Sequence, residues 1–61
     1  MKFIYVYDNE TKEKLLDSGY KLMTTQIINN KETFIFLNNG KKLNFDNMNI
    51  NLTNNLPQNF M

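Results

Sequence analysis

Residues 32–45 read ETFIFLNNGKKLNF and carry the strongest local folding signal in this chain. Asn39-Gly40 is typical of the type I′ turn of a two-residue β-hairpin, in which both central residues need a positive φ. A turn there would place four apolar side chains on one face, because strand side chains alternate with a period of two. The expected cross-strand pairs are Phe34 with Phe45, Phe36 with Leu43, Leu37 with Lys42 and Asn38 with Lys41.

The composition excludes several classes of function. The chain has 61 residues, which is one domain at most, and it contains no Cys and no His. A chain this short buries only about 60% of the surface that it exposes when unfolded, so its core is small. The missing residue types are those that form disulfides, ligate most zinc ions and act most often as general bases. We therefore expect no cofactor, no metal site and no enzymatic activity.

The charges are nearly balanced, with seven basic and six acidic residues and a net charge of +1. Every basic residue is Lys, so the bidentate guanidinium contacts that hold phosphates and guanines are missing. This argues against a dedicated nucleic-acid or membrane-surface protein. Residues 3–7 form an apolar run that is too short for a membrane span or a signal peptide. We expect a cytoplasmic protein.

The first half of the chain predicts a strand followed by a helix. Residues 2–7, KFIYVY, are β-branched and aromatic, which predicts an interior strand with Ile4 and Val6 on one face. Asp8 is a good N-cap for a helix over residues 9–18. Gly19 then ends the helix as its left-handed C′ residue, which would let Tyr20 pack back onto Leu15.

The second half predicts further strands. Residues 20–28 form a strand antiparallel to the one that follows, with its register left open by a turn of uncertain length at 29–31. Apolar residues alternate with polar ones over 47–53, which suggests a short fifth strand. The expected fold is α+β, with a mainly antiparallel sheet of four or five strands and one short helix on one face. We assign residues 1–53 to the domain and 54–61 to a C-terminal tail.

An apolar patch is expected on the sheet face opposite Phe34 and Phe36. If the helix covers those two side chains, the alternate residues of the same strand face outward, and exposed apolar patches usually mark a partner. Two alternatives stay open: the tail covers this face through Leu52, Leu56 or Phe60, or the patch mediates self-association. The predicted partner-binding residues are Ile35, Leu37, Lys42, Asn44, Ile4 and Val6.

Three other residue groups have weaker functional interpretations. The aromatic residues could form a base-stacking platform, although their neighbours are not basic and the two strand phenylalanines are needed for a core. Lys41 and Lys42 could contact phosphate at the hairpin tip, although lysines there more often protect an edge. The acidic residues of the helix are most simply a solvated face. The aromatic set is Tyr5, Tyr7, Tyr20, Phe34 and Phe36.

The chain resembles small proteins of Firmicute phages and mobile elements over residues 1–53. In those proteins a strand, a helix with an acidic cap, a glycine and a YKLL-like strand precede an FIF…N hairpin. The matching positions here are residues 5–8, 14–16, 19–22 and 34–36. The resemblance implies a phage setting, in which small single domains often inhibit host defence proteins, anti-CRISPR proteins among them. It supplies no site residues.

These observations predict a non-enzymatic protein-binding module. It would inhibit or modulate a host protein through an exposed sheet face or sheet edge. A small nucleic-acid-binding accessory protein, using Lys21, Lys31, Lys41 and Lys42, is the first alternative. A homodimer that completes its sheet across an edge strand is the second.

Overall fold

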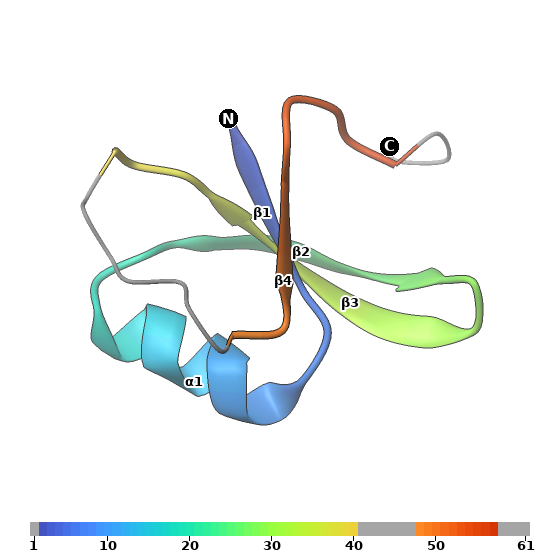
Figure 1. Cartoon of the computed structure of the whole chain (residues 1–61), viewed down its shortest axis with the longest axis horizontal. Coiled ribbons are helices and arrows are strands. Elements are labelled where there is room, and N and C mark those ends of the chain that lie inside the picture. The colour runs from blue at the N-terminus through green and yellow to red at the C-terminus, as the bar shows by residue number, and fades with distance from the viewer. Residues whose placement is uncertain (1, 41–47, 58–61) are drawn as a thin grey trace.

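One helix packs on one face of a four-stranded antiparallel sheet in the computed structural model of this protein, which describes residues 2–40 and 48–57 (Figure 1). The strand order is β2-β3-β1-β4. The predicted α+β fold with one short helix is therefore confirmed. The elements are β1 (Phe3–Val6), α1 (Asn9–Asp17), β2 (Leu22–Ile28), β3 (Lys31–Leu37) and β4 (Ile50–Thr53).

The strand β1 lies inside the sheet, between β3 and β4, and is antiparallel to both. Its β-branched and aromatic residues suit a pleated surface that is covered on both sides. Both β1 and β2 are antiparallel to β3, so they run parallel to each other with β3 between them. The unit from β1 through α1 to β2 is thus a split βαβ arrangement.

Both ends of α1 are capped as the sequence predicts. The Asp8 side chain accepts a hydrogen bond from the Thr11 N–H at 3.2 Å, which satisfies one of the free donors of the first turn. At the other end the Tyr20 N–H donates to the Leu15 carbonyl at 3.0 Å and the Gly19 N–H to the Leu16 carbonyl at 3.1 Å. These two bonds and the φ of 90° at Gly19 define a Schellman motif.

The type I′ turn lies ten residues before the predicted position. Ile28 pairs with Lys31, so the loop between β2 and β3 consists of Asn29 and Asn30 alone. Their φ values are 52° and 64°, which is the left-handed conformation that a type I′ turn requires at both positions. Asparagine tolerates this conformation better than other residues with a side chain. The turn whose length the sequence left open therefore has two residues.

The predicted hairpin over residues 32–45 does not form, because both edges of β3 are already paired. Phe34 lies opposite Val6 on one side and Thr25 on the other, so it has no edge left for Phe45. At the predicted turn only Gly40 has a positive φ, 79°, among the two central residues. Residues 41–47 lie outside the described residues, and with them the predicted positions of Leu43 and Phe45. The expected fifth strand is present as β4, paired with β1 rather than with a hairpin strand.

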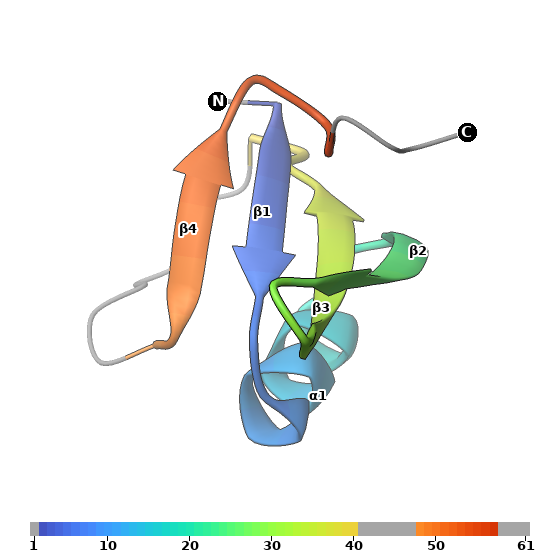
Figure 2. The same ribbon diagram turned by 90° about the vertical axis from the view of Figure 1, so that its right-hand side faces the viewer.

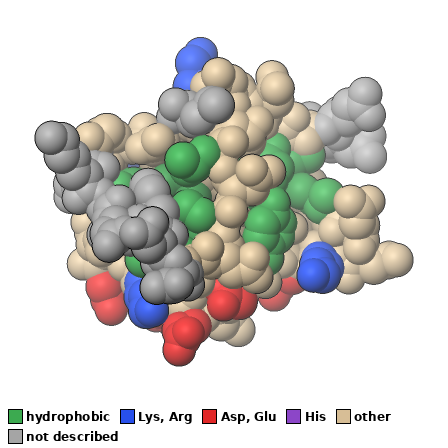
Figure 3. Space-filling model, in the orientation of Figure 1, with side chains coloured by type: hydrophobic (Ala, Val, Ile, Leu, Met, Phe, Trp, Pro, Cys, Tyr) green, Lys and Arg blue, Asp and Glu red, His purple; other side chains and the backbone are tan. Residues whose placement is uncertain are grey.

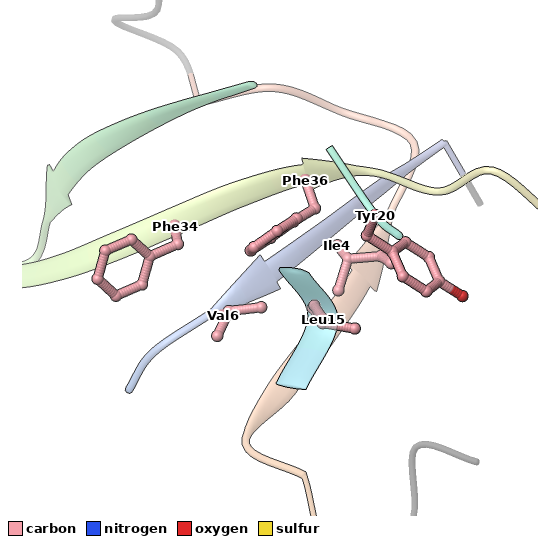
Figure 4. Close-up of a cluster of buried hydrophobic side chains, with 6 residues drawn as sticks. All are labelled: Ile4, Val6, Leu15, Tyr20, Phe34 and Phe36. Carbon is pink, nitrogen blue, oxygen red and sulfur yellow. The ribbon is translucent and has the colours of Figure 1, made fainter. Parts of the chain in front are cut away.

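The core lies between α1 and the sheet. Ile4 faces Phe36 and Val6 faces Phe34 across the β1–β3 ladder, and Leu15 from α1 packs against this layer (Figure 4). Ile50 adds a partly buried contact from β4, while the Lys12 ammonium lies 5.1 Å from the centre of the Phe34 ring. The buried cluster is Ile4, Val6, Leu15, Tyr20, Phe34 and Phe36.

Candidate functional site

Of the four described residues of the predicted partner-binding patch, three are fully buried. Ile4 and Val6 are fully buried, because the observed register places them on the same face as Phe34 and Phe36, under α1. The expectation that they lie beside Ile35 on the open face was wrong. It rested on an assumed face for β1, which alternation alone cannot choose when both faces of a strand are apolar.

Ile35 is also fully buried, although it lies on the face away from α1. Its cross-strand neighbours there are Tyr5 and Thr24, and Leu37 on the same face keeps 44% of its surface exposed. The expected exposure of Ile35 was therefore wrong, while that of Leu37 is confirmed. Lys42 and Asn44 lie outside the described residues.

Residues just after β4 contact the start of β1. The segment after β4 passes across the start of β1, as Figure 2 shows. The Tyr5 hydroxyl donates to the Asn55 carbonyl at 2.7 Å, and the Lys2 N–H donates to the Asn54 side-chain oxygen at 3.1 Å. Partial burial raises the pKa of Tyr5 above its ordinary value of 10.0, and the neighbouring Tyr7 adds to the increase. Of the three residues expected to cover this face, Leu52 pairs with Ile4 and so lies on the α1 side of the sheet, and Phe60 lies outside the described residues. The contacts of Asn54 and Asn55 with β1 do not test coverage by Leu56.

The aromatic residues do not form one platform. Phe34, Phe36 and Tyr20 are buried in the core under α1, whereas Tyr5 lies half-buried on the opposite face. Of the lysines considered for phosphate contact, Lys21 and Lys31 lie at the two ends of β2, and Lys41 and Lys42 lie outside the described residues. The acidic side chains visible in Figure 3 gather on the side of the molecule where α1 lies.

The outer edge of β2 is the most exposed apolar feature of the described sheet. The strand is LMTTQII, with no charged residue, no Pro and no Gly over its seven residues. Ile27 is 71% exposed, and Leu22 and Met23 are 38% exposed. Within residues 2–40 and 48–57, β3 is the only strand that pairs with β2. Edge strands in soluble proteins usually carry charges or Pro that prevent pairing with another chain, and β2 carries neither.

A β-bulge interrupts this edge near its start. Leu22 pairs with Phe36 and Thr24 with Ile35, so Met23 is an extra residue on β2. Such bulges increase the local twist of a strand, and Figure 2 shows β2 turned strongly relative to β1 and β4. The regular part of the edge is therefore residues 24–28.

The ladder determines which backbone groups of β2 point away from the sheet. In antiparallel pairs, hydrogen-bonded and non-hydrogen-bonded positions alternate, and the residues that flank a two-residue loop are hydrogen-bonded. Counting from Ile28, the hydrogen-bonded positions are Ile28, Gln26 and Thr24. The Leu37 N–H bond to the Lys21 carbonyl, at 3.1 Å, marks Leu22 as non-hydrogen-bonded, which agrees with this count once the bulge is included. Thr25 and Ile27 thus direct their N–H and C=O groups to the outer edge.

No group of three or more Asp, Glu, His or Cys side chains lies close enough to hold a metal ion in the described part of the chain. No helix within it is long and apolar enough to cross a membrane. At β2 the described surface offers backbone hydrogen bonding and apolar contact.

Sequence reasoning missed this edge, although the sequence holds a signal for it. Residues 22–28 form an uncharged run between Lys21 and Lys31, and they suit an edge only if β3 has its second neighbour elsewhere. The predicted hairpin supplied that neighbour from residues 41–45, and so the pairing of β1 with β3 was not foreseen. Comparison with known proteins adds no assignment, since no family model, curated protein or solved structure matches the chain.

Proposed function

We propose that this protein is a non-enzymatic protein-binding module that adds an extended segment of a partner protein to the outer edge of β2. The observation that carries the proposal is the uncharged β2 strand, which is unpaired on its outer side within the described residues and holds Ile27 at 71% exposure. Strand addition of this kind gains affinity from main-chain hydrogen bonds and specificity from alternate side chains.

The edge places a definite demand on the partner. Thr25 and Ile27 offer their backbone groups, so the bound segment needs an extended stretch with free N–H and C=O groups at matching spacing. Ile27 lies opposite Glu32, on the same side of the sheet as Phe34, and is left uncovered there. An apolar side chain of the partner that packs beside Ile27 would stabilise the complex. The gain is about 25 cal/mol for each Å² of apolar surface that leaves water.

We further propose that the partner is a host protein in the cytoplasm, which this chain inhibits or modulates. This part of the proposal rests on the resemblance to small phage proteins alone, and the anti-CRISPR class is its narrowest form. The wider statement, protein binding through the β2 edge, does not depend on the source of the chain.

The test compares variants of the edge and of the open face in a pull-down from nuclease-treated host lysate. Ile27→Lys adds a charge to the edge, and Thr25→Pro removes an N–H that points outward and is not used in the β2–β3 ladder. Leu37→Asp is the matched control on the open face, since Leu37 is also exposed.

A protein that is retained by the wild type and by Leu37→Asp, but lost with both edge variants, would support the proposal. A protein retained by both edge variants and lost with Leu37→Asp would refute the β2 edge as the binding site. Recovery of nucleic acid alone, when nuclease is omitted, would favour the nucleic-acid alternative instead. Circular dichroism of each variant shows that the fold is intact.

A further inference from the structure

We propose that the β2 edge also binds a second copy of this chain, with the two β2 strands antiparallel about a two-fold axis at Gln26. The two sheets would then form one continuous sheet across both copies. The inference concerns the edge named in the proposed function, but neither its argument nor its test requires a partner protein.

The register follows from the outward backbone groups. With the axis at Gln26, Thr25 of each copy lies opposite Ile27 of the other. Both residues direct their N–H and C=O groups outward, so each of these two pairs can exchange both of its hydrogen bonds. All outward groups of the regular part of the edge are then satisfied.

The neighbouring registers are poorer. An axis at Thr25 would place Met23 opposite Ile27, and Met23 belongs to the bulge, where the ladder is disrupted. An axis at Ile27 would place Thr25 opposite Asn29, whose φ of 52° belongs to the turn and not to a strand. Only the axis at Gln26 pairs residues of the regular strand, outside both the bulge and the turn, at every outward position.

The side chains agree with self-pairing in this register. Residues 22–28 carry no charge, so two copies bring no like charges together along the strand. The exposed Ile27 of one copy meets Thr25 of the other, and a β-branched pair of this kind packs well across strands. On the other face the two Gln26 side chains lie opposite each other, where their amides can donate and accept reciprocally.

The expected dimer is weak and depends on salt. A single strand edge buries less than the roughly 1,000 Å² that a stable interface needs, so the dimer should form only at high protein concentration. Lys21 and Lys31 flank β2, and the antiparallel arrangement brings Lys21 of one copy to the end occupied by Lys31 of the other. Salt screens this repulsion and should strengthen association.

Self-pairing would regulate the proposed function. A strand edge accepts one neighbour, so a second copy and a partner segment compete for β2. The apparent affinity for a partner should then fall as the total concentration of this protein rises into the range of dimer formation.

A single introduced cysteine tests the axis directly, because the natural chain has none. In the proposed register Gln26 is a non-hydrogen-bonded pair on the axis, with Cα atoms about 4.5 Å apart, which is within the range that a disulfide spans. Gln26→Cys should therefore form a covalent dimer several-fold faster than Asp17→Cys under mild oxidation, since Asp17 is exposed on α1 and remote from the axis. Thr25→Cys should react no faster than Asp17→Cys, because two Thr25 residues are diagonal in this register.

Faster dimer formation by Thr25→Cys than by Gln26→Cys would overturn the register. Equal rates for all three variants would overturn the dimer itself, whatever the outcome of the partner experiment. The wild-type chain gives an independent readout by hydrogen exchange. Protection of the Thr25 and Ile27 amides should rise with protein concentration and be absent in Ile27→Lys, and unchanged protection over the range would refute self-pairing at this edge.

Discussion

Ile35 and Leu37 give a matched test of burial on the face of the sheet away from α1, because they lie on the same face of the same strand. Ile35 is fully buried and Leu37 is 44% exposed. Replacing a fully buried Ile by Ala costs about 2–5 kcal/mol, which combines lost burial with the cavity that remains. Leu37→Ala should cost only about 1 kcal/mol, since roughly half of the side chain is in water already and no closed cavity forms.

These values are large on the scale of so small a domain. At about 0.05–0.15 kcal/mol per residue, a 61-residue chain has a total free energy of unfolding of roughly 3–9 kcal/mol. Ile35→Ala therefore removes a large share of the total, and Ile35→Asp, which adds a buried charge, should prevent folding. Ile35→Val, at a cost of about 0.5–1.5 kcal/mol, keeps the series measurable.

Urea unfolding followed by far-ultraviolet circular dichroism measures these differences. With a slope of about 1 kcal/mol per molar urea, a loss of 1 kcal/mol lowers the midpoint by about 1 M. The urea midpoint should be highest for the wild type, lower for Leu37→Ala and lowest for Ile35→Ala. Equal midpoints for the two alanine variants, or a folded Ile35→Asp, would refute the burial of Ile35 and return this face to the partner-binding candidates.

Other predictions concern the cap, the turn and a tyrosine. Asp8→Ala should lower the free energy of unfolding by about 0.5–2 kcal/mol, because the Thr11 N–H loses its acceptor. In the same urea assay, Asp8→Asn should keep most of the wild-type stability, because its side-chain oxygen can still accept this bond. Asn30→Gly should raise the free energy of unfolding by up to about 1 kcal/mol, and with it the thermal midpoint, because glycine has no steric cost at a φ of 64°. A lower thermal midpoint would contradict the type I′ turn. Tyr5→Phe should cost about 0.5–1.5 kcal/mol at pH 7 through the lost bond to the Asn55 carbonyl. Because folding raises the pKa of Tyr5, the wild type keeps this contribution below pH 10 and loses it as the pH rises above 10, so stability should fall less steeply there in Tyr5→Phe.

The local features of this fold could be predicted because short-range chemistry decides them. The Asp8 cap, the Gly19 end of α1 and the contact between Tyr20 and Leu15 each involve residues within a few positions. The interior position of β1 also followed from its own residues, since both of its faces are apolar.

The pairing partners of β3 could not be predicted because two arrangements satisfy the same pattern. Phe34 and Phe36 could face Phe45 and Leu43 in a local hairpin, or Val6 and Ile4 across the sheet. Asn-Gly is the stronger turn signal, yet the observed fold turns at Asn29-Asn30 and pairs β3 with β1, which buries Ile4 and Val6 under α1.

The predicted partner-binding face differs from the observed surface for the same reason. Once β1 takes one edge of β3, its apolar residues join the core and Ile35 is enclosed, so the predicted face loses three of its members. The edge of β2 becomes the outer limit of the sheet instead. Which strand ends a sheet depends on all pairings together, and alternation within single strands does not encode it.

The place of β1 in the sheet also sets the order in which the sheet can be completed during folding. Among the described strands β1 comes first in the sequence, and its two neighbours are β3 and β4, which begin at Lys31 and Ile50. The hairpin of β2 and β3 closes only a two-residue loop and can form early, whereas both pairings of β1 join residues far apart in the sequence and are slow. A partly folded chain in which β4 is not yet in place would therefore expose the apolar, uncharged β1 as a second aggregation-prone edge.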